Sequence, residues 1–424
     1  MPKLFAPATS EVDPNTQPFD GIICIGGEDW WYHNRGHFDF QIMRRLAKNW
    51  PVLFVNSIGV RFPTLTNKAV FAQRIGRKIK SLARGMTNVE NDFWVYSPLS
   101  VPGRTGQAFS NWTLASQINI AAKRIGIKKP LVWVHCPPGA NIVDHLNPVA
   151  TVLQRTDRFE AFPEGDHHLI SAQIQKLKSR ADVVIYAAPH LMDEETNTVR
   201  NQLLVTHGVD VEKFENAGNR SSPIPDDIKA CDSAWKKANP QNSTPKRIGF
   251  IGGLDAHTFD ADMFLEIART LPQFQFVLVG GSSLPEDWCT LENVALLGRK
   301  PYDDIAGYMA AMDVLIMPWN NSDWIKACNP IKLKEYIAVG RPIVTRDFAA
   351  LGPWREFVKT AETAPEFADA IRAAALAPFD PIPGQTALKG ESWDEKAQVI
   401  ARTLTQIAKA NINTAPNRKL SSAA

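Results

Sequence analysis

Lys332 and Glu335 stand three residues apart in a short segment with helix-boundary residues at both ends. Asn329 suits a helix cap, Pro330 the first helical position, and Gly340 the left-handed residue after the last turn. A helix N-terminus offers free N–H groups to an anion such as a phosphate, and a lysine in the first turn adds positive charge. A carboxylate on the same face could accept hydrogen bonds from a ribose diol. The segment therefore predicts a nucleotide-binding helix, and the alternative is a surface helix with a solvated ion pair.

Two titratable residues in the first half follow apolar runs. His135 follows the run 131–134, and Asp157 lies just after the run 149–154. If these runs are parallel strands, their carboxyl ends open into the crevice where α/β proteins bind ligands. The alternative for His135 is a core or loop histidine. The alternative for Asp157 is an ion pair with one of three arginines, Arg155, Arg158 or Arg180.

The elements that must position these residues follow a regular pattern. Short apolar runs alternate with longer amphipathic segments, which is typical of parallel sheets covered by helices. The runs 22–25 and 248–251 end in double glycines, Gly26-Gly27 and Gly252-Gly253. Glycine lets the backbone approach a ligand closely, although each pair could equally be a tight turn. Neither pair continues as GxGxxG or GxxxxGK[ST], so neither a nicotinamide-type site nor a P-loop is supported.

Bulk properties exclude several classes of protein. A chain of 424 residues is too long for one compact core, so we expect two domains. A net charge of +3 does not suggest a nucleic-acid partner. The five cysteines are scattered without a CxxC pair, which argues for a cytoplasmic protein and against a disulfide framework or a zinc site. No segment reaches the roughly 18 to 20 apolar residues that cross a bilayer.

A change of composition marks the expected domain boundary. Between residues 214 and 246 the chain becomes rich in Asn, Ser, Pro and Lys. We therefore expect an N-terminal domain over residues 18–215, a linker over 216–245 and a C-terminal domain over 246–390. A final helix is expected within residues 391–412.

Several motifs of the second half occur in an order that resembles the family-four group of GT-B glycosyltransferases, which build surface polysaccharides. They are Thr206-His207-Gly208-Val209-Asp210, Ile248-Gly249-Phe250-Ile251-Gly252-Gly253, Val277-Leu278-Val279-Gly280, Asp313-Val314-Leu315-Ile316-Met317-Pro318 and the segment 329–342. The resemblance implies an α/β protein of two Rossmann-like, doubly wound domains facing across a cleft. The C-terminal domain would bind a nucleotide sugar and the N-terminal domain an acceptor. The final helix would cross back to the N-terminal domain.

The resemblance also implies a donor site for a UDP- or GDP-sugar, in which Glu335 holds the ribose. The other expected donor-binding residues are Gly27, Gly252, Gly253, Gly298, Arg299, Lys300, Asn329, Pro330, Ile331 and Lys332. Two departures affect this site. Ala327 stands where many family members carry a second glutamate. Leu254-Asp255 stands where many carry a basic pair that neutralises the diphosphate.

For the chemistry, His135 matches a strand-end histidine that contacts the donor sugar in family members. Asp157 lies at what looks like the position of an aspartate in the inverting xanthan glucuronosyltransferase, where it could act as general base. Retaining relatives need no such base, so the stereochemical course stays open. The donor loops lack a DxD-like motif, and we therefore expect neither a metal nor a cofactor.

The segment 68–84, from Lys68 to Arg84, predicts a basic amphipathic helix. Phe71, Ile75, Ile79 and Leu82 recur at helical spacing among basic residues. Such a helix suits an anionic membrane surface that presents a lipid-linked acceptor. The alternative is a helix packed on the N-terminal sheet with a solvated basic face.

Together, these features predict a metal-independent, hexosyltransferase-like enzyme of bacterial polysaccharide or glycolipid assembly. It would be cytoplasmic and peripheral on the inner face of the cell membrane. Two alternatives remain: a nucleotide-sugar epimerase of the same fold, and a degenerate transferase that binds a nucleotide sugar or a partner enzyme without catalysis.

Overall fold

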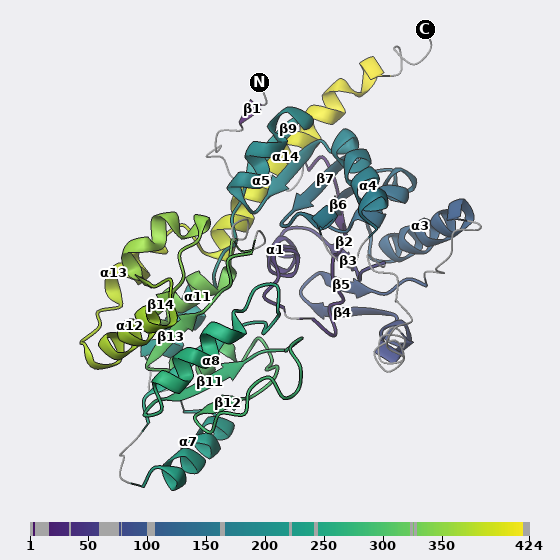
Figure 1. Ribbon diagram of the computed structural model, residues 1–424. Coiled ribbons are helices and arrows are strands. Elements are labelled where there is room, and N and C mark those ends of the chain that lie inside the picture. Colours follow the sequence, from purple (N-terminus) through teal and green to yellow (C-terminus); the bar gives the residue numbers. More distant parts are fainter. Residues whose placement is uncertain are drawn as a thin grey trace. The chain divides into compact units, whose positions relative to one another are not determined.

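A computed structural model gives the fold and describes residues 3–4, 17–33, 35–58, 76–77, 79–99, 107–161, 166–219, 223–240, 245–322, 325 and 329–418. The chain divides into two compact units (Figure 1). The N-terminal domain comprises the residues up to Thr206 together with those from Trp393 onward, and the C-terminal domain comprises His207–Ser392. No helix within the described ranges is long and apolar enough to cross a membrane.

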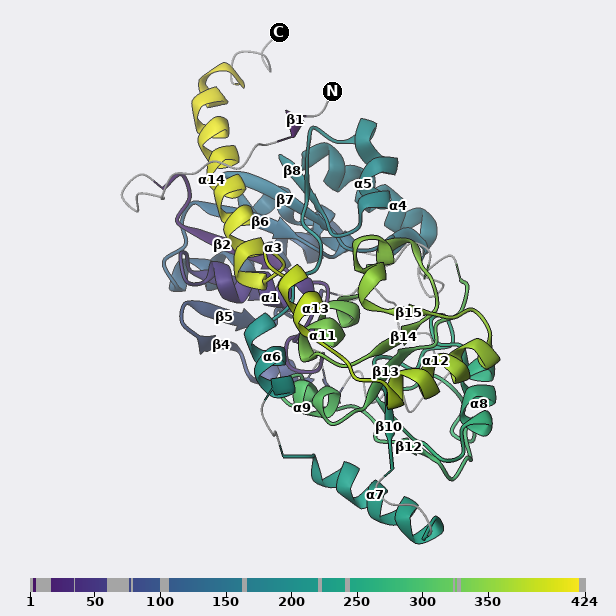
Figure 2. The same cartoon turned by 90° about the vertical axis from the view of Figure 1, so that its left-hand side faces the viewer.

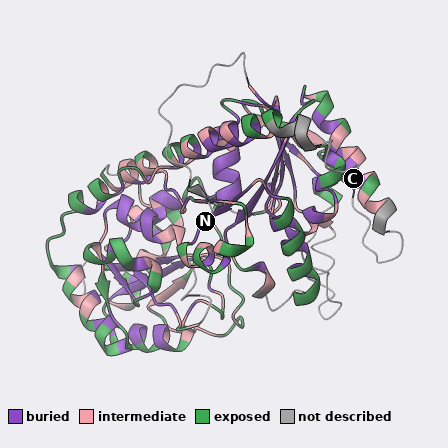
Figure 3. Ribbon diagram, turned by 90° about the horizontal axis from the view of Figure 1, so that it is seen from above, coloured by how far each residue is buried: buried purple, intermediate pink, exposed green. Residues whose placement is uncertain are grey.

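The N-terminal domain is built on a nine-stranded sheet with the order β1-β9-β8-β7-β6-β2-β3-β5-β4. All neighbouring strands are parallel except β4 and β5. The strands are β1 (Lys3–Leu4), β2 (Gly21–Ile25), β3 (Val52–Val55), β4 (Met86–Glu90), β5 (Phe93–Tyr96), β6 (Pro130–Val134), β7 (Ala150–Arg155), β8 (Val183–Tyr186) and β9 (Asn201–Leu204). Every residue of β2, β3, β6, β7 and β8 is buried, as expected for parallel strands covered on both faces (Figure 3).

Helices flank this sheet. They are α1 (Phe38–Leu46), α3 (Gln107–Arg124), α4 (His167–Arg180), α5 (Pro189–Glu195) and α14 (Trp393–Arg418), with the short 3₁₀ turns η2 (Pro137–Asn141), η3 (Val143–Leu146), η4 (Phe159–Ala161) and η5 (Thr196–Thr198). Helix α14, yellow in Figures 1 and 2, packs against α1 and β7. The rings of Phe38 and Trp393 lie 5.7 Å apart, and Arg45 Nε lies 2.9 Å from Asp394 Oδ2. The end of the chain therefore completes the domain that the beginning starts.

The C-terminal domain is built on a six-stranded, all-parallel sheet with the order β12-β11-β10-β13-β14-β15. Numbered within the domain, this is the 3-2-1-4-5-6 order of dinucleotide-binding folds. The strands are β10 (Arg247–Ile251), β11 (Gln275–Val279), β12 (Val294–Leu296), β13 (Val314–Met317), β14 (Ile343–Thr345) and β15 (Lys359–Thr360). The helices are α6 (Val211–Asn219), α7 (Asp226–Ala238), α8 (Ala261–Thr270), α9 (Ile305–Ala310), α11 (Ile331–Val339), η6 (Ala349–Phe357), α12 (Ala364–Leu376) and α13 (Ile382–Ala387).

The domain boundary differs from the expected one. The chain divides between Thr206 and His207, and the stretch 216–245 contains the end of α6 and all of α7. Helix α6 contacts α9 and α11, while α7 contacts β11 and buries Ile228 completely. The polar composition of this stretch reflects the solvent faces of two packed helices, so it does not mark a free linker.

Each sheet has a switch point where the strand order reverses, at β2/β6 in the N-terminal domain and at β10/β13 in the C-terminal domain. Doubly wound sheets bind ligands outside the carboxyl ends of the strands at this point. Gly27 follows β2 and His135 follows β6, while Gly252 follows β10. The topology therefore brings sequence-predicted site residues to the switch point of each domain.

Candidate functional site

Helix α11 carries Lys332 and Glu335 in its first half. Pro330 has extended backbone angles (φ −73°, ψ 122°) and occupies the cap position, so the helix begins at Ile331. The prediction that Pro330 is the first helical residue and Asn329 its cap is wrong by one position. Gly340 ends the helix in the left-handed conformation (φ 70°, ψ 51°), as predicted.

The Lys332–Glu335 pair is not a solvated surface pair. Lys332 Nζ lies 2.6 Å from Glu335 Oε2, and the exposed fractions of the two side chains are 17% and 0%. The second carboxylate oxygen, Glu335 Oε1, is buried and accepts no hydrogen bond within the part of the chain that the structure describes. Burying a polar atom without a partner is costly, and a ligand hydroxyl would supply the missing donor.

A second lysine, which sequence reasoning missed, lies near this pair. Lys213 Nζ, from α6, donates a hydrogen bond to the Tyr302 carbonyl at 3.0 Å and lies 4.2 Å from the centre of the Tyr302 ring. Lys332 Nζ lies 6.0 Å from the centre of the same ring. Burial lowers the pKa of Lys213, although the carboxylates of Asp303, Asp210 and Glu335 oppose that effect. Two ammonium groups thus lie against one aromatic ring, and each has a carboxylate partner, Glu335 for Lys332 and Asp303 (3.8 Å) for Lys213.

The glycine turn after β10 belongs to the same end of the domain as α11. Tyr336 Oη of α11 accepts a hydrogen bond from the Ile251 N–H at 2.7 Å, immediately before Gly252-Gly253. The carboxylate of Asp255 lies beside Gly253, where any side chain would collide with Asp255 Oδ2. The turn therefore carries a negative charge where many resembling proteins carry a basic pair.

The residues expected along the nucleotide base divide into two groups. The guanidinium of Arg299 lies against Gly281, at the end of β11, and is exposed beside Gly298. Lys300 instead forms an ion pair with Asp227 of α7. Arg299 is therefore accessible to a ligand, whereas Lys300 is occupied by its ion pair with α7.

In the N-terminal domain, the imidazole of His135 bridges two side chains. Its Nδ1 lies 3.1 Å from Asp39 Oδ2, and its Nε2 lies 3.0 Å from Thr156 Oγ1. His135 is 7% exposed and Asp39 is fully buried. His135 is therefore buried, as the core alternative required, but both of its ring nitrogens meet polar groups. Sequence reasoning missed Asp39 and Thr156.

Gly27 makes this arrangement possible. A Cβ at residue 27 would lie 2.5 Å from His135 Nδ1, so any side chain would displace the imidazole. The Gly27 N–H also donates to Asp39 Oδ2 at 3.3 Å. The glycine predicted to approach a ligand in fact lies against the histidine.

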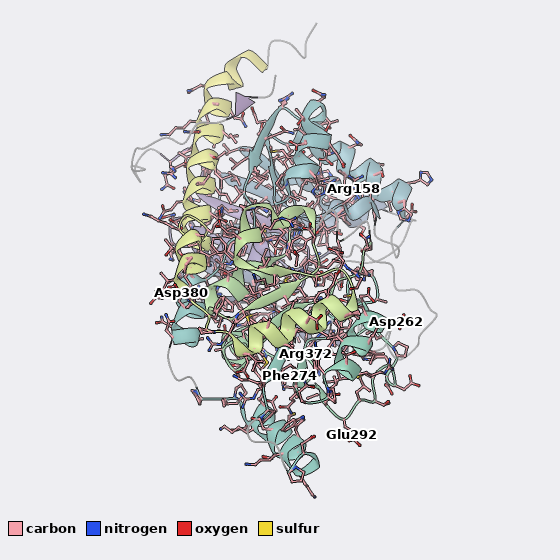
Figure 4. The ribbon with its side chains drawn as sticks, turned by 60° about the vertical axis from the view of Figure 1, so that its left-hand side comes forward. Arg158, Asp262, Phe274, Glu292, Arg372 and Asp380 are labelled. Carbon is pink, nitrogen blue, oxygen red and sulfur yellow. The ribbon has the colours of Figure 1, made fainter. Side chains whose placement is uncertain are left out.

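Asp157 is half-buried and does not pair with the arginines proposed for it. Arg155 pairs with Glu160 and Glu195, Arg158 with Glu194, and Arg180 with Asp144. The ion-pair alternative is therefore wrong; Figure 4 labels Arg158 at the surface. Burial raises the pKa of Asp157, and the charge of His135 and a hydrogen bond from Thr156 oppose that rise.

A cavity of about 440 Å³ lies elsewhere in the C-terminal domain. It is lined by the second half of α11, the edge strand β15, and α12 and α13, with Phe357, Ala370 and Phe379 among its walls. Figure 4 labels Asp380, which lies on its lining. The cavity does not include Lys332 or Glu335, so it is separate from the candidate site.

Comparison with known proteins gives three findings. Residues 245–376 match the family described as Glycosyl transferases group 1. The chain is 27% identical over 196 residues to a Bacillus subtilis (strain 168) protein named as a teichuronic acid biosynthesis glycosyltransferase, TuaH. That match spans 44% of this chain and 46% of TuaH, so about half of each protein is compared.

Solved structures give the third finding. Sucrose-phosphate synthase from Thermosynechococcus elongatus aligns with a TM-score of 0.57 and 15% identity, over 96% of this chain and all of that one. Anabaena Alr3699/HepE in complex with UDP and glucose aligns with a TM-score of 0.54 and 15% identity, over 94% and 99% of the two chains. These likenesses show that the chain has the two-domain, Rossmann-like GT-B fold.

Proposed function

We propose that this GT-B chain, whose residues 245–376 match the group 1 glycosyl transferases, transfers a sugar from a nucleotide-sugar donor to a saccharide or lipid-linked saccharide in bacterial polysaccharide assembly. The observation that carries the proposal is the buried carboxylate of Glu335, which has one oxygen paired with Lys332 and one without a hydrogen-bond donor among the described residues. The relatives named above favour sugar transfer over the epimerase and non-catalytic alternatives.

The donor would bind at the first half of α11. A ribose hydroxyl would donate to Glu335 Oε1, and the diphosphate would face the N–H groups of the helix start beside Lys332. These groups would stabilise the negative charge that develops on the diphosphate as it leaves. Lys213 and Arg299 are further cations of the same domain available to the diphosphate or the base.

The N-terminal domain would supply the base. In this step an acceptor hydroxyl oxygen bonds to the anomeric carbon, the bond from that carbon to the diphosphate oxygen breaks, and the hydroxyl proton passes to the Asp157 carboxylate. The electron pair of the broken bond leaves with the nucleoside diphosphate. Because the acceptor attacks from the side opposite the leaving group, this reaction inverts the anomeric configuration. The step uses no metal, and metal independence stays a prediction.

A thermal-shift screen of the full chain against UDP, GDP and their sugars tests the donor site. A ligand at 100 times its dissociation constant should stabilise the protein by about 2.7 kcal/mol. Glu335→Ala should abolish the shift, because it removes the ribose acceptor. Glu266→Ala, at an exposed position of α8, is the matched control and should keep it. Equal shifts in both variants, or no shift with any nucleotide, would reject the site.

We also propose that the acceptor is presented at an anionic membrane surface that residues 68–84 contact. Most of this segment lies outside the described residues. In the described part, Ile79 is 60% exposed next to Lys80, whereas Ser81 is fully buried. This exposure disagrees with the alternative for Ile79, in which the apolar side of the segment packs on the N-terminal sheet. The described part of the segment packs on the domain through Ser81 and Arg84, whose guanidinium lies 4.3 Å from the centre of the Trp31 ring. It leaves Ile79 and Lys80 exposed, and an exposed aliphatic side chain beside a basic one supports membrane contact.

A further inference from the structure

We propose that Asp39 is a positioning residue for the transfer: it holds the His135 ring through Nδ1, so that Nε2 controls the Thr156 hydroxyl beside Asp157. This inference rests on the proposed function, in which Asp157 is the base. It adds a residue that makes no contact with the acceptor or the donor. Its test therefore includes a readout that needs neither of them.

The Asp39 carboxylate is built into the fold on both of its oxygens. Oδ1 accepts the Phe40 N–H at 3.0 Å, and Oδ2 accepts the Gly27 N–H at 3.3 Å while lying 3.1 Å from His135 Nδ1. The side chain is fully buried in the first turn of α1. A carboxylate buried to this extent is costly unless it is paired, and His135 is its one ionisable partner among the described residues. The pair therefore fixes both the orientation of the ring and the nitrogen that carries its first proton.

The other ring nitrogen points to Asp157 through one hydroxyl. His135 Nε2 lies 3.0 Å from Thr156 Oγ1, and Thr156 directly precedes Asp157, whose pKa its hydroxyl acts to lower. Asp39, His135 and Thr156 thus form one chain of hydrogen bonds, which starts on α1 and ends next to Asp157, just after β7.

A threonine hydroxyl has one proton to donate, so this chain has two states. When His135 is neutral with its proton on Nδ1, Nε2 must accept, and the Thr156 hydroxyl donates to the ring. When His135 is protonated, Nε2–H donates to Thr156, and the hydroxyl is free to donate to the Asp157 carboxylate. A hydrogen bond to a carboxylate favours its ionised form. The protonated ring therefore keeps Asp157 ionised and ready to accept a proton.

The charged groups around the ring favour the protonated state. Burial lowers the pKa of His135, but the carboxylates of Asp39, Asp157 and Glu28 more than offset it, so the pKa is raised. Burial raises the pKa of Asp39, and His135 reverses this, so the carboxyl pKa is lowered. The other titratable groups that interact with this cluster are His37, just before α1, Arg155 of β7, and the buried thiols of Cys24 and Cys136.

The experiment compares Asp39→Asn with Asp182→Asn in the full chain. Asparagine keeps the shape of Asp39 and removes its charge. Asp182 is a partly buried carboxylate of the same domain that accepts the Thr151 N–H, so it controls for loss of a structural acid. Nitrogen chemical shifts of ¹⁵N-labelled histidine, followed through a pH titration without ligand, report the protonation of each ring nitrogen.

In the wild type, His135 should titrate above its ordinary value of about 6.5 and carry its neutral-state proton on Nδ1. Asp39→Asn should lower the titration midpoint, and Asp182→Asn should leave it unchanged. In turnover assays, Asp39→Asn should reduce kcat at least 10-fold with less than a 3-fold change in the donor KM. The acid limb of kcat/KM should move to higher pH, because Asp157 loses the Thr156 hydrogen bond.

A wild-type His135 that titrates at or below about 6.5, or that carries its neutral-state proton on Nε2, would overturn the inference without any variant. The inference is also overturned if Asp39→Asn leaves the titration midpoint of His135 or the acid limb of kcat/KM unchanged, even when activity is reduced. If the titrations behave as expected but no nucleotide sugar is turned over, the proposed function fails and the positioning of His135 stands.

Discussion

Asp157 remains available as a base because the cations near it in sequence are occupied. Arg155 lies two residues before it and is fully buried, with its guanidinium paired to Glu160 and Glu195. Glu160 comes three residues after Asp157, so this pairing also ties down the loop that carries the aspartate. The arginine thus acts on the position of Asp157 without neutralising it.

Replacing this base should stop turnover and spare donor binding. Asp157→Ala should lower kcat by roughly 10²- to 10⁴-fold, the usual contribution of a general base. Asp193→Ala, at an exposed position of the same domain, should have no effect. The pKa of Asp157 is raised, and only the ionised carboxylate accepts a proton, so wild-type kcat/KM should fall as the pH drops through that raised value. Near wild-type turnover in Asp157→Ala would exclude the base and leave a retaining course.

Single residues were predictable from the sequence where their partners are local. Lys332 and Glu335 share a helix face at a spacing of three, and the structure joins them. Asp39 lies 96 residues from His135, and no sequence pattern around either residue indicates that the two side chains are in contact. Lys213 lies three residues after Asp210, the last residue of a motif quoted above, but its approach to Tyr302 depends on how α6 packs against α9.

At the level of elements, apolar runs predicted the buried strands, because a strand that is covered on both faces needs apolar side chains at successive positions. The strands that escaped prediction lack such runs. Strand β15 is two exposed residues, and β4 is only partly buried. Helix α11 was predictable from its glycine stop, whereas its start was misplaced by one residue because proline tolerates both the cap and the first turn.

The stop of α11 should be sensitive to substitution. Gly340→Ala forces a Cβ into a left-handed conformation, which costs about 1–2 kcal/mol, and places it 2.7 Å from Pro381 Cβ. Gly307→Ala, in α9 with open space around it, should instead stabilise by about 0.5–1 kcal/mol. Differential scanning calorimetry should therefore show shifts of opposite sign in the transition of the C-terminal domain. Shifts of the same sign would contradict the left-handed stop.

At the level of the whole molecule, alternating runs predicted two parallel-sheet domains, and the strand orders confirm them. The sequence placed the boundary too late, because surface helices and linkers share a polar composition. A surface helix differs from a linker in being packed against other elements, and this packing depends on contacts between residues far apart in the chain.

Membrane contact is a property of the full chain and is tested with it. The protein should float with liposomes that contain anionic lipid and remain behind with neutral ones. Ile79→Asp with Lys80→Glu should reduce flotation, since it removes an exposed apolar side chain and reverses a charge. Leu376→Asp with Lys389→Glu, at exposed positions of the other domain, makes the same change of charge and is the matched control, which should float normally. Equal flotation of all three proteins would exclude contact through this segment.

Helix α14 has a consequence for biosynthesis. Its apolar residues Trp393, Ile400 and Leu404 are completely buried, yet they are translated after the entire C-terminal domain. During synthesis on the ribosome, the surface of α1 that α14 covers therefore stays exposed until α14 has been translated. Until then the N-terminal domain lacks one of its helices. A stop codon before α14 would leave the domain without that helix.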